Sequence, residues 1–320
     1  MSAFSPVTAA LPAIAETVAE GLQRYPKSLS PWLLYDAEGS RLFEEITALP
    51  EYYLTGVERE ILEQHAGDVL REAGSSLALL ELGAGTAAKT ATLIRALLGR
   101  QLQVNYYPID VSGSALQVAC RSLGAISPRI KVHPIIADYT RGVDAIASVG
   151  GRRLALYLGS SIGNFEPEEA VTVLRRLRSH LRAGDALVLG ADLVKSAPLL
   201  RRAYNDAAGV TARFNKNMLA RINRELGGHF ELRQFRHRAL WNRQRSRIEM
   251  YLVSARVQSV AIDVLDMEVA FAAGERIHTE NSYKYTPDRL DSMLRQGGFD
   301  PERRWTDRHG WFALSLARAA

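Results

Sequence analysis

The sequence has very little cysteine and no long apolar run, and each absence excludes a class of protein. Among 320 residues there is one cysteine, Cys120, which cannot form a disulfide within the chain. A zinc site built on cysteines needs at least two thiolates, so that class is excluded too. No stretch approaches the roughly 18 to 20 apolar residues that cross a bilayer. We therefore expect a reduced, cytoplasmic protein that does not bind a membrane.

Metal-binding and export signals are also lacking. The seven histidines are isolated in the sequence and form no pattern such as H-E-x-x-H, so we expect no metal site. Residues 1–22 have no basic segment before their apolar residues, and Glu16 and Glu20 interrupt those residues. This pattern predicts an amphipathic helix and not a signal peptide.

The composition is that of an ordinary globular protein, with 47% hydrophobic and 23% charged residues, and this excludes a disordered chain. The length suggests two domains or one large one. The formal charge of +5 raises the question of nucleic acid, and the stretch from Arg233 to Arg247 contains no acid, with Phe235 and Trp241 interleaved. A solvated strand or helix face explains so short a stretch better. We expect a monomer with no nucleic acid partner.

Apolar runs bounded by turn residues alternate with helical patterns between residues 58 and 195. The runs are Leu77 to Leu82, Val104 to Ile109, Val132 to Ala137, Leu154 to Leu158 and Ala186 to Gly190. Helical patterns between them include Ala88 to Leu98 and Glu168 to Leu181. Buried strands alternating with helices predict a parallel sheet covered on both faces, which is a doubly wound α/β domain.

A second pattern follows between residues 196 and 283. A helix is predicted over Thr211 to Leu226, and then three strand-like runs without helices between them, which favour one antiparallel meander. These runs are Arg247 to Val253, Val260 to Val264 and Met267 to Phe271. After a helix over Thr286 to Gln296, strands at Arg304 to Asp307 and Trp311 to Leu316 are expected to return to the first sheet. We assign 58–195 and 284–320 to a cofactor-binding domain, and 1–57 and 196–283 to an inserted α+β substrate-binding domain.

A glycine pair, Gly83 and Gly85, follows the first predicted strand and precedes Lys89 and a helix. Glycines at this place let the backbone turn tightly and approach a ligand. The spacing Gly83, Gly85 and Ala88 also satisfies the dinucleotide pattern, and a tight turn without a ligand is a further alternative.

Two acids stand at the ends of the next strands. Asp110 can accept hydrogen bonds from ribose hydroxyls, and Asp138, with the ring of Tyr139 beside it, suits an adenine. Each acid could also cap the following helix. The pair favours S-adenosylmethionine over NAD, because an NAD-dependent dehydrogenase has no use for the second acid.

The fourth predicted strand runs into small residues, Gly159 to Gly163, followed by Asn164. Small residues at the carboxyl end of a central strand open the crevice in which doubly wound proteins bind ligands. Asn164 offers both a donor and an acceptor there, although it could equally shape the turn.

Seven segments together resemble the histidine Nα-methyltransferase family of ergothioneine biosynthesis, from about Lys27 to Leu316. They are LPEYY (Leu49 to Tyr53), ELGAGTAAKT (Glu81 to Thr90), LGSSIGN (Leu158 to Asn164), GADLVK (Gly190 to Lys195), RAYNDAAGVTARFNKN (Arg202 to Asn217), RIEM (Arg247 to Met250) and GERIHTENSYKY (Gly274 to Tyr285). The resemblance implies a class I methyltransferase fold with a Rossmann-like sheet, S-adenosyl-L-methionine as cofactor and L-histidine as substrate.

The resemblance also implies roles for single residues. Tyr52, Asn164 and Tyr204 would hold the amino acid part of the substrate, and Glu280 and Ser282 its imidazole. Residues i and i+2 of an extended segment face the same side, so these last two could reach one ring independently of the family argument.

Further residues match the family pattern but are weaker candidates for the site. Met250 would form a wall of the imidazole pocket or belong to the core. Thr211 and Phe214 could line the site, or they could have core or capping roles. Tyr35 and Phe43 match aromatic residues of the family near the methyl-transfer site. The residues implied for the cofactor are Phe43, Gly83, Gly85, Lys89, Asp110, Asp138 and Tyr139, the last replacing a usual phenylalanine.

The predicted activity is trimethylation of the α-amine of L-histidine to hercynine, with Tyr52 and Tyr35 nearest the chemistry. Imidazole has two ring nitrogens for Glu280 and Ser282, whereas indole has one N–H and would leave a polar partner unmatched. The alternatives are an N-methyltransferase for tryptophan or another aromatic amino acid, a nucleic-acid methyltransferase, and a non-catalytic cofactor-binding scaffold.

Overall fold

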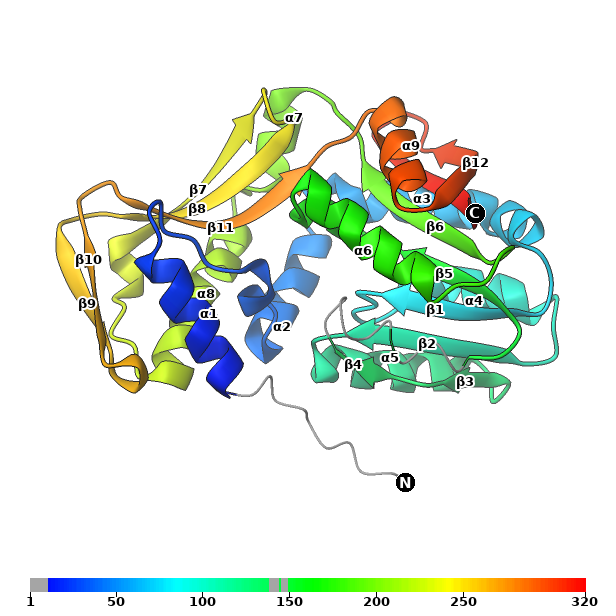
Figure 1. The fold of residues 1–320 in the computed structure, drawn as a ribbon, viewed down its shortest axis with the longest axis horizontal. Coiled ribbons are helices and arrows are strands. Elements are labelled where there is room, and N and C mark those ends of the chain that lie inside the picture. Colours follow the sequence, from blue (N-terminus) through cyan, green and yellow to red (C-terminus); the bar gives the residue numbers. More distant parts are fainter. Residues whose placement is uncertain (1–10, 138–143, 145–148) are drawn as a thin grey trace. The chain divides into compact units, whose positions relative to one another are not determined.

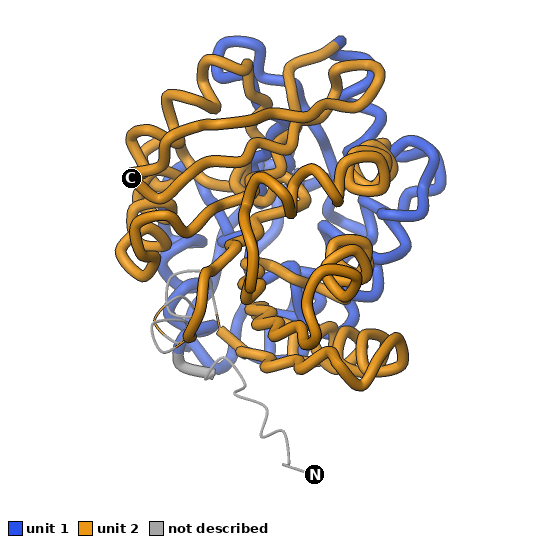
Figure 2. Tube along the Cα trace, turned by 90° about the vertical axis from the view of Figure 1, so that its right-hand side faces the viewer, with its two compact units in different colours: residues 1–52, 196–282 blue, residues 53–195, 283–320 orange. Residues whose placement is uncertain are grey.

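The computed structural model describes residues 11–137, 144 and 149–320, which form two compact units (Figure 2). Unit 1 consists of the described residues of Met1–Tyr52 together with Ser196–Ser282. Unit 2 consists of the described residues of Tyr53–Lys195 together with Tyr283–Ala320. Each unit is thus assembled from two distant stretches of chain, which pass from one unit to the other at residues 52/53, 195/196 and 282/283.

Unit 2 contains the α/β part of the chain (Figure 1). Its elements are α3 (Tyr53–Ala73), β1 (Leu77–Leu82), α4 (Thr90–Leu98), β2 (Val104–Asp110), α5 (Gly113–Ile126), β3 (Ile130–Val132), β4 (Ile135–Ile136), β5 (Arg152–Tyr157), η3 (Ser161–Asn164), α6 (Pro167–Ser179), β6 (Ala186–Asp192), α9 (Pro287–Gln296), β12 (Phe299–Thr306) and β13 (Phe312–Ala319).

The strands of unit 2 form an eight-stranded sheet in the order β12-β13-β6-β5-β1-β2-β3, with β4 also paired to β2. β1 is parallel to both β2 and β5, and β13 returns antiparallel to β6. The predicted doubly wound sheet and the return of the C-terminal strands are therefore confirmed. Because the chain continues to one side of β1 first and then to the other, a ligand crevice is predicted at the carboxyl ends of β1 and β5.

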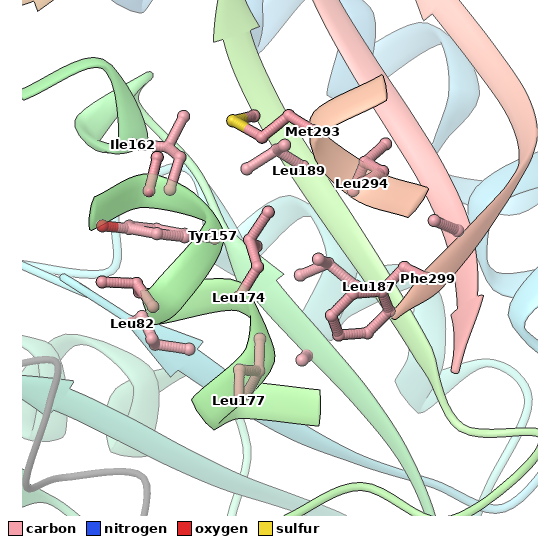
Figure 3. Packing of buried hydrophobic residues seen from close by; sticks show 14 of the residues in the cluster. Leu82, Tyr157, Ile162, Leu174, Leu177, Leu187, Leu189, Met293, Leu294 and Phe299 are labelled. Atoms are coloured by element: carbon pink, nitrogen blue, oxygen red, sulfur yellow. The ribbon is translucent and has the colours of Figure 1, made fainter. Parts of the chain in front are cut away.

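Helices pack on the sheet of unit 2 because its central strands are apolar on both faces. All six residues of β1 are buried. In Figure 1, α6 and α9 lie in front of the sheet and α3 behind it. Figure 3 shows Leu174 and Leu177 of α6 beside Leu82 and Tyr157 of the sheet, all in one buried cluster.

One predicted strand of unit 2 is wrong. The run from Val132 to Ala137 forms two short strands, β3 and β4, and not one. His133 and Pro134 separate them. Proline has no amide hydrogen to donate to a neighbouring strand, so it interrupts the ladder although the apolar pattern continues.

A buried ionic cluster surrounds Asp192 at the end of β6. The Asp192 carboxylate accepts a hydrogen bond from the Tyr53 hydroxyl at 2.8 Å and lies 2.9 Å from the Lys284 ammonium. The Lys195 ammonium also pairs with Asp192 and lies 2.9 Å from the Tyr53 oxygen. Burial lowers the pKa of Lys195 to about 8 in spite of this pair. Asp192 thus pairs with two buried lysines, one three residues away and one from a distant part of the sequence.

Unit 1 contains helices and short antiparallel strands. Its elements are α1 (Leu11–Gln23), η1 (Pro31–Leu34), α2 (Ala37–Thr47), α7 (Ala197–Ala203), α8 (Val210–Leu226), η4 (Leu232–Gln234), β7 (Phe235–Asn242), β8 (Arg247–Ser254), β9 (Gln258–Ile262), η5 (Asp263–Leu265), β10 (Met267–Phe271) and β11 (Arg276–Tyr283), whose last residue belongs to unit 2.

The predicted single meander of unit 1 is wrong. β8 is the middle strand of a three-stranded sheet with β11 and β7, and β9 and β10 form a separate pair. The sequence concealed β11 because its buried residues 279–282 are all polar, so no apolar alternation marks them. The acid-free arginine stretch supplies β7, on which Arg236 and Arg238 are exposed, as expected for a solvated strand face. Arg247 differs, since it is buried and bonded to Glu249 at 2.8 Å.

The described part of the N-terminal region, from residue 11 onward, begins with the predicted amphipathic helix, α1. Within the described residues, no helix combines the length and the apolar character needed to cross a membrane.

Candidate functional site

The turn after β1 holds two glycines with left-handed backbones. Gly83 has φ +69° and Gly85 φ +53°, a conformation that favours glycine. A Cβ added to Gly85 would meet no atom within 4 Å, so this residue faces open space. Its amide donates to Asp110 Oδ2 at 2.8 Å. The turn therefore exposes its backbone beside a carboxylate.

Asp110, at the end of β2, fits the predicted ribose contact. Its Oδ1 accepts the Ser112 amide at 2.8 Å, so each carboxylate oxygen has one amide donor and can accept another hydrogen bond. Burial raises the pKa of Asp110, a cost that further hydroxyl donors would offset. Ser112, and not Asp110, caps helix α5, because its side chain accepts the Ala115 amide at 3.4 Å. The residues present thus suit a cofactor with a ribose.

Asp138 and Tyr139, predicted to contact the adenine, lie outside the described residues.

Lys89 and Gly159 meet at the carboxyl ends of β1 and β5, and Glu58 of helix α3 joins them. Glu58 forms an ion pair with the Lys89 ammonium. The Gly159 amide donates to the Glu58 carboxylate oxygens at 2.8 and 3.0 Å. Glu58 is fully buried, whereas the Lys89 side chain is 23% exposed. A cation is therefore held at the mouth of the predicted crevice.

Asn164 ends the short helix η3 in a tightly packed turn. Gly159 and Ser160 before it have φ of +77° and +61°. A Cβ added to Gly163 would lie 2.9 Å from the Tyr283 carbonyl oxygen, so only glycine fits there without a shift. The glycines of this segment thus shape its turn, and Asn164, which is half-buried, stays a predicted site residue.

Five aromatic residues predicted for the site form one cluster within unit 1. Tyr35 lies 5.7 Å from Phe43 and 5.6 Å from Phe214 between ring centroids. Phe43 lies 6.1 Å from Tyr52, and Tyr52 lies 6.2 Å from Tyr204. Most of these pairs meet edge to face, the arrangement that aromatic quadrupoles favour. The faces of aromatic rings attract an ammonium or sulfonium charge, so a cluster of this kind suits a cationic reactant.

The polar end of unit 1's site is built on strand β11. Ser282 and Tyr204 share a hydrogen bond of 2.7 Å between their hydroxyl oxygens, and both residues are buried. Glu280, two residues before Ser282 in the same strand, is also buried and lies on the same face. Met250 is 2% exposed on the adjacent strand β8. The structure thus connects Tyr204 with one of the two residues predicted to hold the imidazole.

Thr211 stands at the start of helix α8. Its amide donates to Asp206 Oδ1 at 2.8 Å, and the Val210 amide donates to Oδ2 at the same distance. Asp206 therefore satisfies the first amides of the helix, which Gly209 at the N-cap cannot do with a side chain. The Thr211 amide thus belongs to the helix start, and the place of its side chain in the site stays a prediction.

Two polar residues next to Tyr204, the half-buried His237 and the buried Asn215, were not identified from the sequence. His237 Nε2 lies 2.9 Å from the Tyr204 carbonyl oxygen, and Asn215 Nδ2 lies 3.0 Å from His237 Nδ1. Burial lowers the pKa of His237, so the neutral ring donates to Tyr204 and accepts from Asn215. No sequence pattern pointed to His237. Glu58 had a signal, because it is a charged residue on the apolar face of α3.

The predicted site residues divide between the two units. Unit 1 holds Tyr35, Phe43, Tyr52, Tyr204, Thr211, Phe214, Met250, Glu280 and Ser282, and unit 2 holds Gly83, Gly85, Lys89, Asp110, Gly159 and Asn164. Phe43, predicted for the cofactor, belongs to the unit that carries most substrate residues, and Asn164 to the unit of the glycine turn. Among the described residues, no group of three or more His, Cys, Asp or Glu side chains could hold a metal ion.

Comparison with known proteins identifies the family. The sequence matches the model of the SAM-dependent, histidine-specific methyltransferases over residues 14–319. Two proteins named histidine N-alpha-methyltransferase are similar to it: that of Mycolicibacterium smegmatis is 44% identical and that of Mycobacterium tuberculosis 42%, each over 95% of this chain and 94% of the relative. The 4-dimethylallyltryptophan N-methyltransferase of Claviceps purpurea is 24% identical, covering 92% of this chain and 91% of that protein. The chain therefore belongs to the family of S-adenosylmethionine-dependent, histidine-specific methyltransferases.

Proposed function

We propose that this protein transfers three methyl groups from S-adenosylmethionine to the α-amine of L-histidine and so makes hercynine, in the first step of ergothioneine biosynthesis. The observation that carries the proposal is the buried polar group of Glu280, Ser282 and Tyr204 in unit 1. It combines a carboxylate with two hydroxyls, which suits an imidazole. The names of the two mycobacterial relatives support the same substrate.

In this proposal, unit 2 holds the cofactor and unit 1 most of the substrate. The Asp110 carboxylate accepts the ribose hydroxyls, and the open backbone at Gly85 admits the cofactor beside it. Lys89 receives the carboxylate of the cofactor's amino acid part. Tyr52 and Tyr204 of unit 1 bind the amino acid part of histidine, and the Asn164 amide of unit 2 can donate and accept hydrogen bonds.

S-adenosylmethionine supplies an activated methyl group on a sulfonium, so the protein's main task is to position a neutral amine in line with it. Tyr52 and Tyr35 lie in the aromatic cluster and carry hydroxyls that can orient the amine and take its proton through water. No strong general base is required. His237 fixes the backbone of Tyr204 and so stabilises this arrangement.

Substrate choice then depends on Glu280 and Ser282. Imidazole can pair with both, while an indole would leave one of them unmatched at a cost of about 1 to 3 kcal/mol. A tryptophan derivative remains the alternative substrate, since one relative is named for such an activity. Its identity to this chain, 24%, is well below the 44% of the first mycobacterial protein.

The test is mass spectrometry of the purified protein incubated with S-adenosylmethionine and each standard amino acid in turn. Trimethylated histidine alone is the expected result. Methylated tryptophan would contradict the substrate, and no methylation of any amino acid would favour the non-catalytic scaffold. A Glu280→Ala variant should lose at least tenfold in kcat/KM for histidine relative to tryptophan. Glu268→Gln, which changes an exposed glutamate on β10 of the same unit, is the matched control.

We also propose that the protein acts as a monomer in the cytoplasm without a nucleic acid partner. These expectations rest on the lone cysteine and the scattered charges of the sequence. Light scattering of the eluted protein during gel filtration tests the oligomeric state, and a mass of about twice 35.4 kDa would contradict it.

A further inference from the structure

Glu58 is a fully buried carboxylate of unit 2, and three separate segments of the chain surround it. The Lys89 ammonium pairs with it from the turn after β1, and the Gly159 amide donates to both of its oxygens from the turn after β5. On the third side, a Cβ added to Gly190 of β6 would lie only 2.3 Å from Glu58 Oε1. The sheet therefore leaves room for this carboxylate by having glycine there.

Burying a carboxylate is unfavourable unless its partners compensate it, and a packed apolar residue would usually stabilise the fold as well or better. The contacts of Glu58 are directed at one place, the carboxyl ends of β1 and β5. This is where a doubly wound sheet binds its ligand. The pattern suggests that Glu58 serves the ligand site and not the core.

We propose that Glu58 is a positioning residue for the cofactor: it fixes the Lys89 ammonium and the Gly159 amide so that Lys89 receives the carboxylate of the cofactor's amino acid part. The inference rests on the proposed function. Glu58 itself does not touch the cofactor, because its side chain is fully buried, while that of Lys89 is 23% exposed.

The physical reason lies in the lysine. A free lysine side chain has several rotatable bonds, and holding it in one position on ligand binding costs conformational entropy. An ion pair with a buried carboxylate restricts the ammonium before the ligand arrives. The ammonium has three N–H donors, so donation to Glu58 leaves others for an anion on the exposed side.

The experiment measures binding of S-adenosylhomocysteine, which has the same amino acid part as the cofactor, by isothermal titration calorimetry. Glu58→Gln keeps an acceptor for the Gly159 amide but removes the charge that holds Lys89. We expect its Kd to rise about tenfold or more. KM for S-adenosylmethionine should rise in parallel, and KM for histidine should stay near the wild-type value.

Asp291→Asn is the matched control, since it removes a carboxylate that pairs with Arg304 between α9 and β12. In the sheet of unit 2, β12 is four strands away from β1. This variant should bind S-adenosylhomocysteine as the wild type does. Equal Kd values for the wild type and Glu58→Gln would overturn the inference. An equal rise of KM for S-adenosylmethionine and of KM for histidine in Glu58→Gln would also overturn it.

A second comparison is informative even if the single variant Glu58→Gln does not fold. If Glu58 acts through Lys89, the double variant Glu58→Gln/Lys89→Gln should bind S-adenosylhomocysteine as Lys89→Gln does, and it leaves no unpaired buried charge. A further tenfold loss in the double variant would show an independent effect of Glu58 and refute the proposal. Absence of binding by the wild-type protein would instead overturn the proposed function, and this inference with it.

Discussion

Glu81 of β1 offers a quantitative test of how the cofactor turn is built. Its carboxylate is buried and accepts hydrogen bonds from the Thr90 hydroxyl at 2.7 Å and from the Tyr106 hydroxyl. Burial raises the pKa of Glu81 to about 7, and these hydrogen bonds and the Lys89 charge only partly oppose the rise. At neutral pH, therefore, this carboxyl is only partly ionised in the folded protein.

The sign of the effect on stability follows from this shift. The folded pKa lies above the ordinary value of 4.5, so the folded state binds more protons than the unfolded state between the two values. The free energy of unfolding must then fall as the pH rises through this range. At about 1.4 kcal/mol per unit of pKa shift, the full loss is about 3.5 kcal/mol, of which about 2 to 3 kcal/mol falls between about pH 5 and about pH 8.5.

The assay is urea unfolding of the wild type and of Glu81→Gln across this pH range. The amide has nearly the same shape and cannot ionise, so the wild-type stability minus the variant stability isolates Glu81. This difference should decrease by about 2 to 3 kcal/mol from the acidic to the alkaline end. A difference that stays constant, or one that increases with pH, would refute the reasoning.

Two further changes test other parts of unit 2. Asp192→Asn removes the carboxylate that pairs with two buried lysines, and it should lower the free energy of unfolding, measured in urea, by about 3 to 5 kcal/mol. Asp291→Asn, which removes the carboxylate of a partly exposed pair, should lower it by about 1 kcal/mol or less. Gly163→Ala places a Cβ 2.9 Å from the Tyr283 carbonyl oxygen, and by moving the turn before Asn164 it should lower kcat/KM for histidine about tenfold. In the control Gly124→Ala the new Cβ meets no atom within 4 Å, so kcat/KM should be unchanged. Steady-state methylation rates decide this comparison, and equal losses in the two glycine variants would contradict the steric argument.

The α/β architecture of unit 2 and the position of its glycine turn could be predicted from the amino-acid sequence. The central strands are buried on both faces, so they appear as continuous apolar runs that residue type alone reveals. Gly83 and Gly85 were recognisable because a left-handed turn after a strand favours glycine. The family motifs were equally visible, since each is a short local segment, and the match over residues 14–319 confirms them.

The pairing of strands in unit 1 was decided by the tertiary structure. β11 lacks an apolar alternation because its four consecutive buried residues 279–282 are polar, and the partner of Ser282 is Tyr204, 78 residues away in the sequence. The arginine-rich β7 and the apolar β8 are neighbours in one sheet although their compositions differ. Periodicity records which face of a strand is buried, but not which strand lies beside it.

The sequence also does not reveal the partners of Glu58 at the candidate site. Its position on the apolar face of α3 marks it as unusual, yet its partners lie 31 and 101 residues further along the chain. The local sequence pattern predicts the turns and the buried faces of helices and strands, because these depend on neighbouring residues. Which distant charges meet in the interior depends on how the whole sheet and its helices pack, and only the folded structure contains that information.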